Sequence, residues 1–295
     1  MPDLPRVLTA MVTPFDDALQ VDLGRAKELA ARLVEETSGG GVLVAGTTGE
    51  TPTLTGREKL DLFGAVVSAV GDRAFVLAGT GNYNTAESVE LSKAAQDAGV
   101  HGVMLTTPYY NKPPQDCLIR HFTECAAAVD LPIVLYQVPS RTATRLEPQT
   151  TVRLAREVDN IVALKDAGAN INETSSVRLG APDGFLIYSG NDGETLPILA
   201  VGGYGVISVA SHVAGPAIAR MIDAFVAGDN AAALKEHLGL LPIIDVLFTV
   251  TNPIPVKAAL GLRGMDVGGL RPPLYAADPA LKGRIESVLR ESGVL

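Results

Sequence analysis

Apolar, β-branched segments recur along the chain at intervals of roughly thirty residues, the length of one strand plus a returning helix. Eight such segments can be counted, namely Val7–Thr13, Gly41–Gly46, Phe75–Gly79, Gly102–Thr107, Pro132–Val138, Ile161–Lys165, Phe185–Ser189 and Gly205–Ser208. Continuous apolar runs of this length are typical of parallel strands that are buried on both faces. The pattern therefore predicts eight strands, each followed by a helix.

The stretches between these segments carry signals for the start and the end of helices. Thr55 and Glu58 form a capping box, and Gly71 is expected to end the helix that follows them. Asn84 is an expected N-cap, and Pro148 fits the first turn of a helix. Strict strand–helix alternation gives a parallel sheet, and eight units close into a (β/α)8 barrel. A doubly wound sheet is less favoured, because no dinucleotide-binding fingerprint follows the first strand.

The strand pattern stops after about Ala227. The remainder predicts three helices, which are Asn230–Phe248, Pro255–Leu262 and Pro279–Glu291. We therefore expect a barrel with the active site over residues 1–227 and a C-terminal helical region over residues 228–295. The expected role of the helical region is packing or contact between subunits.

The composition excludes several classes of function. The chain has 295 residues, a net charge of -9 and no basic cluster, which argues against nucleic acid and anionic membranes as partners. Its first residues, Met1–Pro5, lack the basic and apolar regions of a signal peptide, and no apolar run reaches membrane-spanning length. The two cysteines, Cys117 and Cys125, match no metal or redox spacing. We therefore expect a soluble cytoplasmic protein.

Active sites of such barrels lie at the carboxyl ends of the strands. The residues at those ends are rich in hydroxyl groups and poor in metal ligands. Their carboxylates form no obvious pair, and the four histidines, His101, His121, His212 and His237, are scattered. A metal-dependent barrel is therefore disfavoured, and we expect no metal site.

Lys165 follows the apolar residues of the sixth predicted strand. Lysine is rarely fully buried unless it is paired or functional. Burial would depress the pKa of Lys165 and yield the neutral amine that acts as the nucleophile in Schiff-base chemistry. The alternative is that Lys165 extends from the end of the strand into solvent.

The other strand ends suit a keto acid that forms a Schiff base. Tyr136 ends the neighbouring strand and is the best candidate for a proton carrier. Arg141 could bind a second carboxylate, although a solvated loop arginine is the alternative. The Gly46–Gly49 turn could bind an anion through its backbone N–H groups, or it could simply be a tight connection.

Six motifs follow one another from the second strand into the helical region. They are Gly46–Glu50, Thr107–Pro113, Tyr136–Thr142, Lys165–Asp166, Gly205–Val209 and Asn252–Lys257. Through them the whole chain resembles the pyruvate-dependent class I aldolase superfamily typified by dihydrodipicolinate synthase and N-acetylneuraminate lyase. The resemblance implies a Schiff base with pyruvate, no further cofactor, and a homotetramer built as a dimer of dimers.

The resemblance also implies catalytic roles. Lys165 would form the Schiff base with pyruvate. Tyr136, Thr47 and Tyr110 would form a proton relay, with Tyr110 supplied by a neighbouring subunit across a dimer interface.

Four further residues are implied in substrate binding. Thr48 and the backbone at Ile207 would hold the carboxylate of pyruvate and its surroundings. Arg141 would receive the carboxylate of the second substrate, and Gly190 lies in the turn that follows the seventh strand.

Within the superfamily, the motifs favour the condensation of pyruvate with L-aspartate 4-semialdehyde to 4-hydroxy-tetrahydrodipicolinate. Two departures from the family pattern leave an alternative function open, that of a related aldolase acting on 4-hydroxy-2-oxoglutarate or a 2-keto-3-deoxy sugar acid. Gln137 stands where asparagine is usual, and Asn191 stands where aspartate is common. A third hypothesis is a non-catalytic barrel, and the retained lysine, tyrosines and threonines argue against it.

The resemblance includes inhibition by lysine in some members, at a site for which this chain has unusual residues. Gly56 and Lys59 take positions that are often histidine, and Tyr83 replaces an asparagine, whereas Glu87 is kept. A cationic Lys59 would repel the ammonium group of a bound lysine. We therefore expect lysine to inhibit weakly or not at all.

Overall fold

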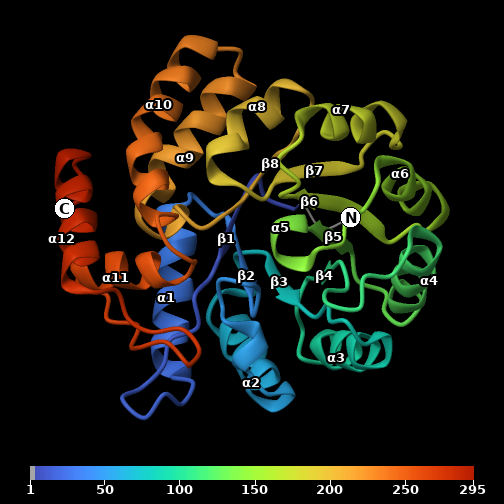
Figure 1. The fold of residues 1–295 in the computed structure, drawn as a ribbon, viewed down its shortest axis with the longest axis horizontal. Helices are drawn as coiled ribbons and strands as arrows, with labels where there is room; N and C mark the ends of the chain where they lie inside the picture. The colour runs from blue at the N-terminus through green and yellow to red at the C-terminus, as the bar shows by residue number, and fades with distance from the viewer. Residues whose placement is uncertain (1–3) are drawn as a thin grey trace.

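Eight parallel strands close into a barrel in the order of the chain (Figure 1). The structure is a computed structural model that describes residues 4–295. The strands are β1 (Val7–Ala10), β2 (Gly41–Val44), β3 (Val76–Gly79), β4 (Gly102–Thr106), β5 (Ile133–Gln137), β6 (Ile161–Asp166), β7 (Leu186–Ser189) and β8 (Gly205–Ser208). Because β8 pairs with β1, the sheet has no open edge. The predicted (β/α)8 barrel is confirmed, and the doubly wound alternative is wrong.

Helices surround the barrel as an outer ring (Figure 1). They are α1 (Leu23–Glu36), α2 (Gly56–Val70), α3 (Thr85–Asp97), α4 (Gln115–Ala126), α6 (Pro148–Glu157), α7 (Ile171–Gly180), α8 (Thr195–Ala200) and α9 (Ser211–Val226). The short α5 (Pro139–Thr142) lies instead over the middle of the barrel (Figure 1), and two 3-10 turns are η1 (Thr51–Thr53) and η2 (Asp192–Glu194). The predicted helix ends are confirmed. Thr55 and Glu58 form the capping box of α2, Asn84 caps α3, and Pro148 begins α6.

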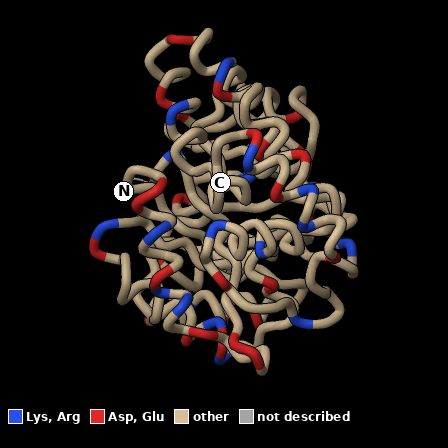
Figure 2. Tube along the Cα trace, turned by 90° about the vertical axis from the view of Figure 1, so that its left-hand side faces the viewer, with Lys and Arg blue, Asp and Glu red and all other residues tan. Residues whose placement is uncertain are grey.

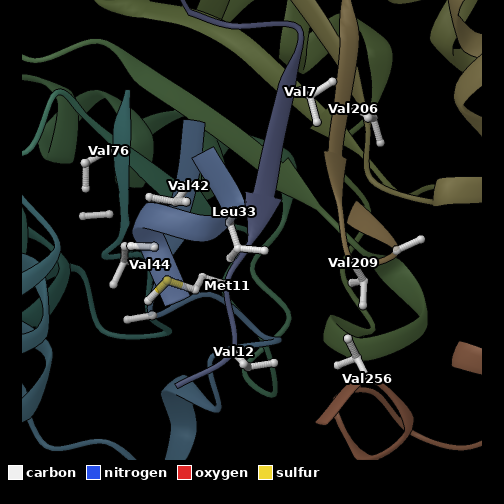
Figure 3. Close-up of a cluster of buried hydrophobic side chains, with 14 of the residues drawn as sticks. Val7, Met11, Val12, Leu33, Val42, Val44, Val76, Val206, Val209 and Val256 are labelled. Atoms are coloured by element: carbon white, nitrogen blue, oxygen red, sulfur yellow. The ribbon is translucent and has the colours of Figure 1, made fainter. Parts of the chain in front are cut away.

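Most positions of the strands are apolar because each strand is covered on two sides. Val42 and Val44 of β2 pack outward against the helices, near Leu33 of α1 (Figure 3). Leu43, between them, belongs to the separate cluster inside the barrel. Each such side chain contributes about 1.5–3 kcal/mol when fully buried. The interior is thus a packed core, and chemistry is confined to its end.

Three helices follow the barrel, namely α10 (Asn230–Leu247), α11 (Ile254–Leu262) and α12 (Pro279–Glu291). They lie at one side of the barrel, beside α9 and α1 (Figure 1). Arg263, at the end of α11, forms an ion pair of 3.0 Å with Glu36 of α1. The division of the chain at residue 227 stays a prediction.

Acidic and basic residues are interspersed over the fold (Figure 2). Across residues 4–295, no helix is long and apolar enough to cross a membrane.

Candidate active site

Lys165 lies near the end of β6 and is only 5% exposed. Burial lowers its pKa to about 8, Asp192 acts against this shift, and Arg141 adds to it. The Lys165 Nζ atom lies 4.3 Å from the centroid of the Tyr136 ring. Lys165 therefore does not extend into solvent, and the neutral fraction of its amine at neutral pH is much larger than that of an ordinary lysine, although the protonated form still dominates.

Tyr136 is the direct neighbour of Lys165 across the β5–β6 pair. Its side chain is 5% exposed. Burial raises the pKa of Tyr136, while the Arg141 guanidinium and the Thr47 hydroxyl act in the opposite direction. The phenol is therefore protonated at neutral pH, as a proton donor must be.

The turn after β2 presents the two threonines. The N–H of Gly49 donates to the carbonyl of Gly46 at 3.1 Å, and the Thr13 hydroxyl donates to the carbonyl of Gly49 at 2.7 Å. These bonds hold Thr47 beside Tyr136 and leave Thr48 buried. A tight, internally bonded turn can thus present two hydroxyls at the end of the barrel.

Arg141 and Gly190 are two further candidates for substrate binding. Arg141 is exposed on α5, within electrostatic reach of Lys165 and Tyr136. Gly190 donates its N–H to the carbonyl of Asp166 at 2.7 Å, and a Cβ atom there would lie 2.8 Å from that of Ala167. Position 190 therefore accommodates no side chain.

Ile207 lies in β8, with its side chain in the apolar cluster inside the barrel. Substrate contact by the backbone at Ile207 stays a prediction.

Tyr110 does not join this group within the chain. Its side chain is 92% exposed, and its backbone has a φ of 71°. A side chain this exposed contacts almost nothing in its own chain. Its entry into the site of a neighbouring subunit stays a prediction.

Asp192, at the start of η2, is a buried acid that the sequence pattern did not single out. Its carboxylate accepts hydrogen bonds from the Ser208 hydroxyl and from the N–H groups of Val209 (3.0 Å) and Ala210 (3.2 Å). Burial raises the pKa of Asp192, and these bonds and Lys165 act against the rise. The one available signal was a lone carboxylate just after a strand end.

The two departures from the family pattern are engaged in local contacts. The Gln137 amide donates to Asp166 at 2.9 Å, and Asp166 accepts the hydroxyl of Thr174 on α7 at 2.7 Å. Gln137 therefore faces the helix layer, whereas Tyr136, one residue earlier, faces the interior. The Asn191 amide donates to Glu194 at 2.8 Å.

The histidine nearest to a strand end is structural. His212 is buried, its Nε2 atom accepts the N–H of Val12 at 3.1 Å, and its Nδ1 atom lies 2.8 Å from the carbonyl of Val209. Burial lowers the pKa of His212 to about 4, which keeps the ring neutral. Within residues 4–295, no cluster of three or more histidine, cysteine or acidic side chains could hold a metal.

A separate cavity of about 510 Å³ lies between α2 and α3. Lys59, Tyr83, Glu87 and Tyr109 are among its lining residues. Burial lowers the pKa of Lys59, while Glu87 acts against this shift. The rings of Tyr83 and Tyr109 meet edge to face, with centroids 5.0 Å apart. This cavity is where the unusual residues at positions 59 and 83 come together.

The family model described as the dihydrodipicolinate synthetase family matches residues 3–292. The 4-hydroxy-tetrahydrodipicolinate synthase of Symbiobacterium thermophilum is 54% identical over 295 residues, which cover 100% of both chains. That of Desulforudis audaxviator is 50% identical and covers 99% of both chains.

Two solved structures extend the likeness to the fold. A dihydrodipicolinate synthase from Bacillus anthracis has a TM-score of 0.95 at 43% identity, covering 98% of this chain and 99% of that one. The enzyme from Cyanidioschyzon merolae, solved with lysine bound, has a TM-score of 0.97 at 42% identity, covering 99% of each chain.

Proposed function

The chain belongs to the dihydrodipicolinate synthetase family, and we infer from this that it is a lyase that condenses pyruvate with L-aspartate 4-semialdehyde. The product, 4-hydroxy-tetrahydrodipicolinate, is an intermediate of diaminopimelate and lysine biosynthesis. Identity of about half over the full chain favours this reaction over that of a sister aldolase. The observation that carries the mechanism is the buried Lys165 amine above the ring of Tyr136.

We propose that the first step is attack of the neutral Lys165 amine on the keto carbon of pyruvate. A new C–N bond forms, Tyr136 donates a proton to the departing oxygen, and water leaves. The product is an iminium cation on Lys165. The negative charge of Asp192, which favours a cation at this position, supports such an intermediate.

The iminium then acts as an electron sink. Loss of a proton from the pyruvate methyl group gives an enamine, and the relay of Tyr136, Thr47 and a partner subunit's Tyr110 carries protons to and from the site. The enamine carbon attacks the aldehyde, whose carboxylate pairs with Arg141. The amine of the adduct then attacks the iminium carbon, closes the ring and releases Lys165.

Thr48 and the backbone beside Ile207 hold the carboxylate of pyruvate in this proposal, close to the turn at Gly190. The assembly proposed is a homotetramer built as a dimer of dimers. The 92% exposure of Tyr110 supports an interface at that loop, since the relay needs this hydroxyl to be supplied from another subunit.

Replacing Arg141 with alanine tests the second-substrate clamp. Loss of a charge-assisted hydrogen bond to the semialdehyde carboxylate should lower kcat/KM about 10- to 100-fold. Trapping of pyruvate by borohydride should change far less, because pyruvate reacts before the clamp is needed. Arg153→Ala is the matched control, since Arg153 is exposed on α6 and, among the residues that the structure describes, forms an ion pair with Glu157 alone. Equal damage to trapping and turnover would argue against the clamp.

A panel of aldehydes with the purified enzyme tests the reaction itself. Aspartate semialdehyde should be the preferred acceptor, and the preference should shrink in Arg141→Ala. Preference for the acceptor of a sugar-acid or hydroxy-oxoglutarate aldolase would overturn the assignment. Stabilisation by pyruvate without turnover of any aldehyde would instead indicate a binding protein.

The response to lysine is a further prediction. Lys59 lines the cavity between α2 and α3, and its positive charge opposes binding of an ammonium group. We expect low-millimolar lysine to inhibit turnover of the unmodified enzyme weakly or not at all. The Lys59→Ala variant should be inhibited by lysine more readily. Lys93→Ala, on the exposed face of α3, is the control. Substantial inhibition of the unmodified enzyme would contradict this prediction.

A further inference from the structure

Asn252 connects the C-terminal helices to the turn that carries Thr48. It lies between α10 and α11 and is 6% exposed. Its side-chain amide donates a hydrogen bond of 2.8 Å to the Thr48 hydroxyl, in a buried contact between residues 204 positions apart in the chain. Asn252 is also a member of a sequence motif to which the reaction steps above assign no role.

The direction of this hydrogen bond determines what the Thr48 hydroxyl can do. A hydroxyl has one proton to donate and two lone pairs that accept, whereas an amide NH2 group only donates. Thr48 therefore accepts from Asn252 and keeps its own proton for another partner. Among residues 4–295, no protein atom receives a hydrogen bond from that hydroxyl. A carboxylate, which only accepts, is the complementary ligand.

Neighbouring contacts hold this arrangement in place. Lys257 of α11 forms an ion pair of 2.7 Å with Glu50, which directly follows the Gly46–Gly49 turn, and both side chains are almost completely buried. The Arg271 N–H donates to the other oxygen of Glu50 at 3.0 Å. Removing one partner of such a buried ion pair strongly destabilises the fold, because the other charge is left buried and unpaired. The segment that follows α10 is thus bonded to Glu50, two residues after Thr48.

Asn252 also leaves its side-chain oxygen buried and without a partner. An unsatisfied buried acceptor costs about 1–3 kcal/mol. The chain tolerates this cost at a position whose amide contacts a proposed substrate-binding hydroxyl. Such a cost is expected where a polar group serves orientation rather than stability.

We propose that Asn252 is a positioning residue that fixes the Thr48 hydroxyl as a hydrogen-bond donor toward the carboxylate of pyruvate. This inference rests on the function proposed above. Pyruvate then binds without any reorientation of the hydroxyl proton. Because the carboxylate contact persists from binding to the transition state, Asn252 acts on KM for pyruvate much more than on kcat.

Asn252→Asp reverses the hydrogen bond with little change of shape. The introduced carboxylate accepts the Thr48 proton and withdraws it from pyruvate. KM for pyruvate, and the pyruvate concentration that gives half-maximal borohydride trapping, should rise about 10- to 100-fold. Lowering the pH should partly restore binding, because a protonated carboxyl can donate again. Asn252→Ala, which removes the donor without supplying an acceptor, should give a smaller rise in KM.

Thr48→Val supplies the test of mechanism. If Asn252 acts through Thr48, Asn252→Asp should add almost nothing to the KM of a Thr48→Val enzyme. Asn160→Asp is the matched control, because the Asn160 amide bonds the carbonyls of Ala126 and Val129 at the opposite end of β6. That change should lower the melting temperature and leave KM unaffected.

The outcomes separate the two proposals. Unchanged KM in both Asn252 variants, with normal trapping of the unmodified enzyme, would overturn the role of Asn252. The same would follow if the Asn252 and Thr48 effects were fully additive. Failure of pyruvate to be trapped on the unmodified enzyme would instead overturn the proposed Schiff-base function. If Asn252→Asp does not fold, Asn252→Ala takes its place. Its effect on KM for pyruvate is then compared between the unmodified enzyme and the Thr48→Val enzyme.

Discussion

Replacing Lys165 with arginine is expected to abolish turnover and to remove the site at which borohydride traps pyruvate. Arginine keeps a positive charge and a long side chain, but its guanidinium does not lose a proton in proteins and so offers no nucleophile. Without the covalent route, kcat/KM should fall by about four orders of magnitude or more. Intact-mass measurement after borohydride treatment, followed by peptide mapping, checks both statements.

Lys93→Arg, on the exposed face of α3, is the matched control and should keep full trapping and turnover. Two results would count against the mechanism. One is an unmodified enzyme that turns over but yields no adduct. The other is an adduct that maps to a different lysine.

The depressed pKa of Lys165 adds a dependence on pH. Burial lowers this pKa from 10.5 to about 8, so the trapping rate should rise with pH and level off above that value. Between about pH 8 and 10.5 the unfolded chain binds more protons at this site than the folded one. The free energy of unfolding therefore rises with pH across that window. Below the window the full cost of burying the protonated Lys165 amine, about 3 kcal/mol, destabilises the fold. Lys165→Met should consequently raise the melting temperature at neutral pH.

The fold was predictable because a barrel strand is covered on two sides. Runs such as Val42–Val44 remain apolar at every position, and that signal survives without knowledge of the neighbouring strands. The same continuity hides which residues face inward, since an alternating pattern is what reveals the buried face of a strand. Leu43 faces the interior and its two neighbours do not, and nothing in the run distinguishes them.

The site was predictable where a polar residue interrupts such a run. Lys165 and Tyr136 stand out against apolar neighbours, and strand order places them side by side. Gln137 also stands out against its neighbours. Because successive side chains of a strand point to opposite faces, Gln137 faces the helix layer when Tyr136 faces the barrel interior.

Asp192 and Asn252 could not be found in the same way. The hydrogen bonds of Asp192 go to the start of α9, and that of Asn252 goes to a turn 204 residues away. No local pattern encodes such contacts, because they arise only when the barrel closes and the C-terminal helices pack beside it. Tyr110 is a stronger case, since its proposed partner lies in another subunit.

Tyr136→Phe is expected to separate proton transfer from the placement of Lys165. Phenylalanine keeps the buried ring that lies 4.3 Å from the Lys165 Nζ atom and removes only the hydroxyl. Loss of a positioned general acid should lower kcat about 100- to 10,000-fold. The Lys165 amine remains available, so pyruvate should still be trapped, but at a reduced rate. Rapid-quench trapping and steady-state turnover measure the two effects separately.

Tyr188→Phe makes the same chemical change elsewhere in the barrel interior. The Tyr188 hydroxyl donates to the carbonyl of Pro5, ahead of β1, so its loss should cost about 1 kcal/mol of stability and leave the trapping rate intact. If Tyr136→Phe behaves like Tyr188→Phe, the hydroxyl of Tyr136 serves packing and the proton must come from water or from Thr47. If only Tyr136→Phe slows both trapping and turnover, its hydroxyl carries the proton. The difference between two buried tyrosines, rather than the loss in either one, thus identifies the general acid.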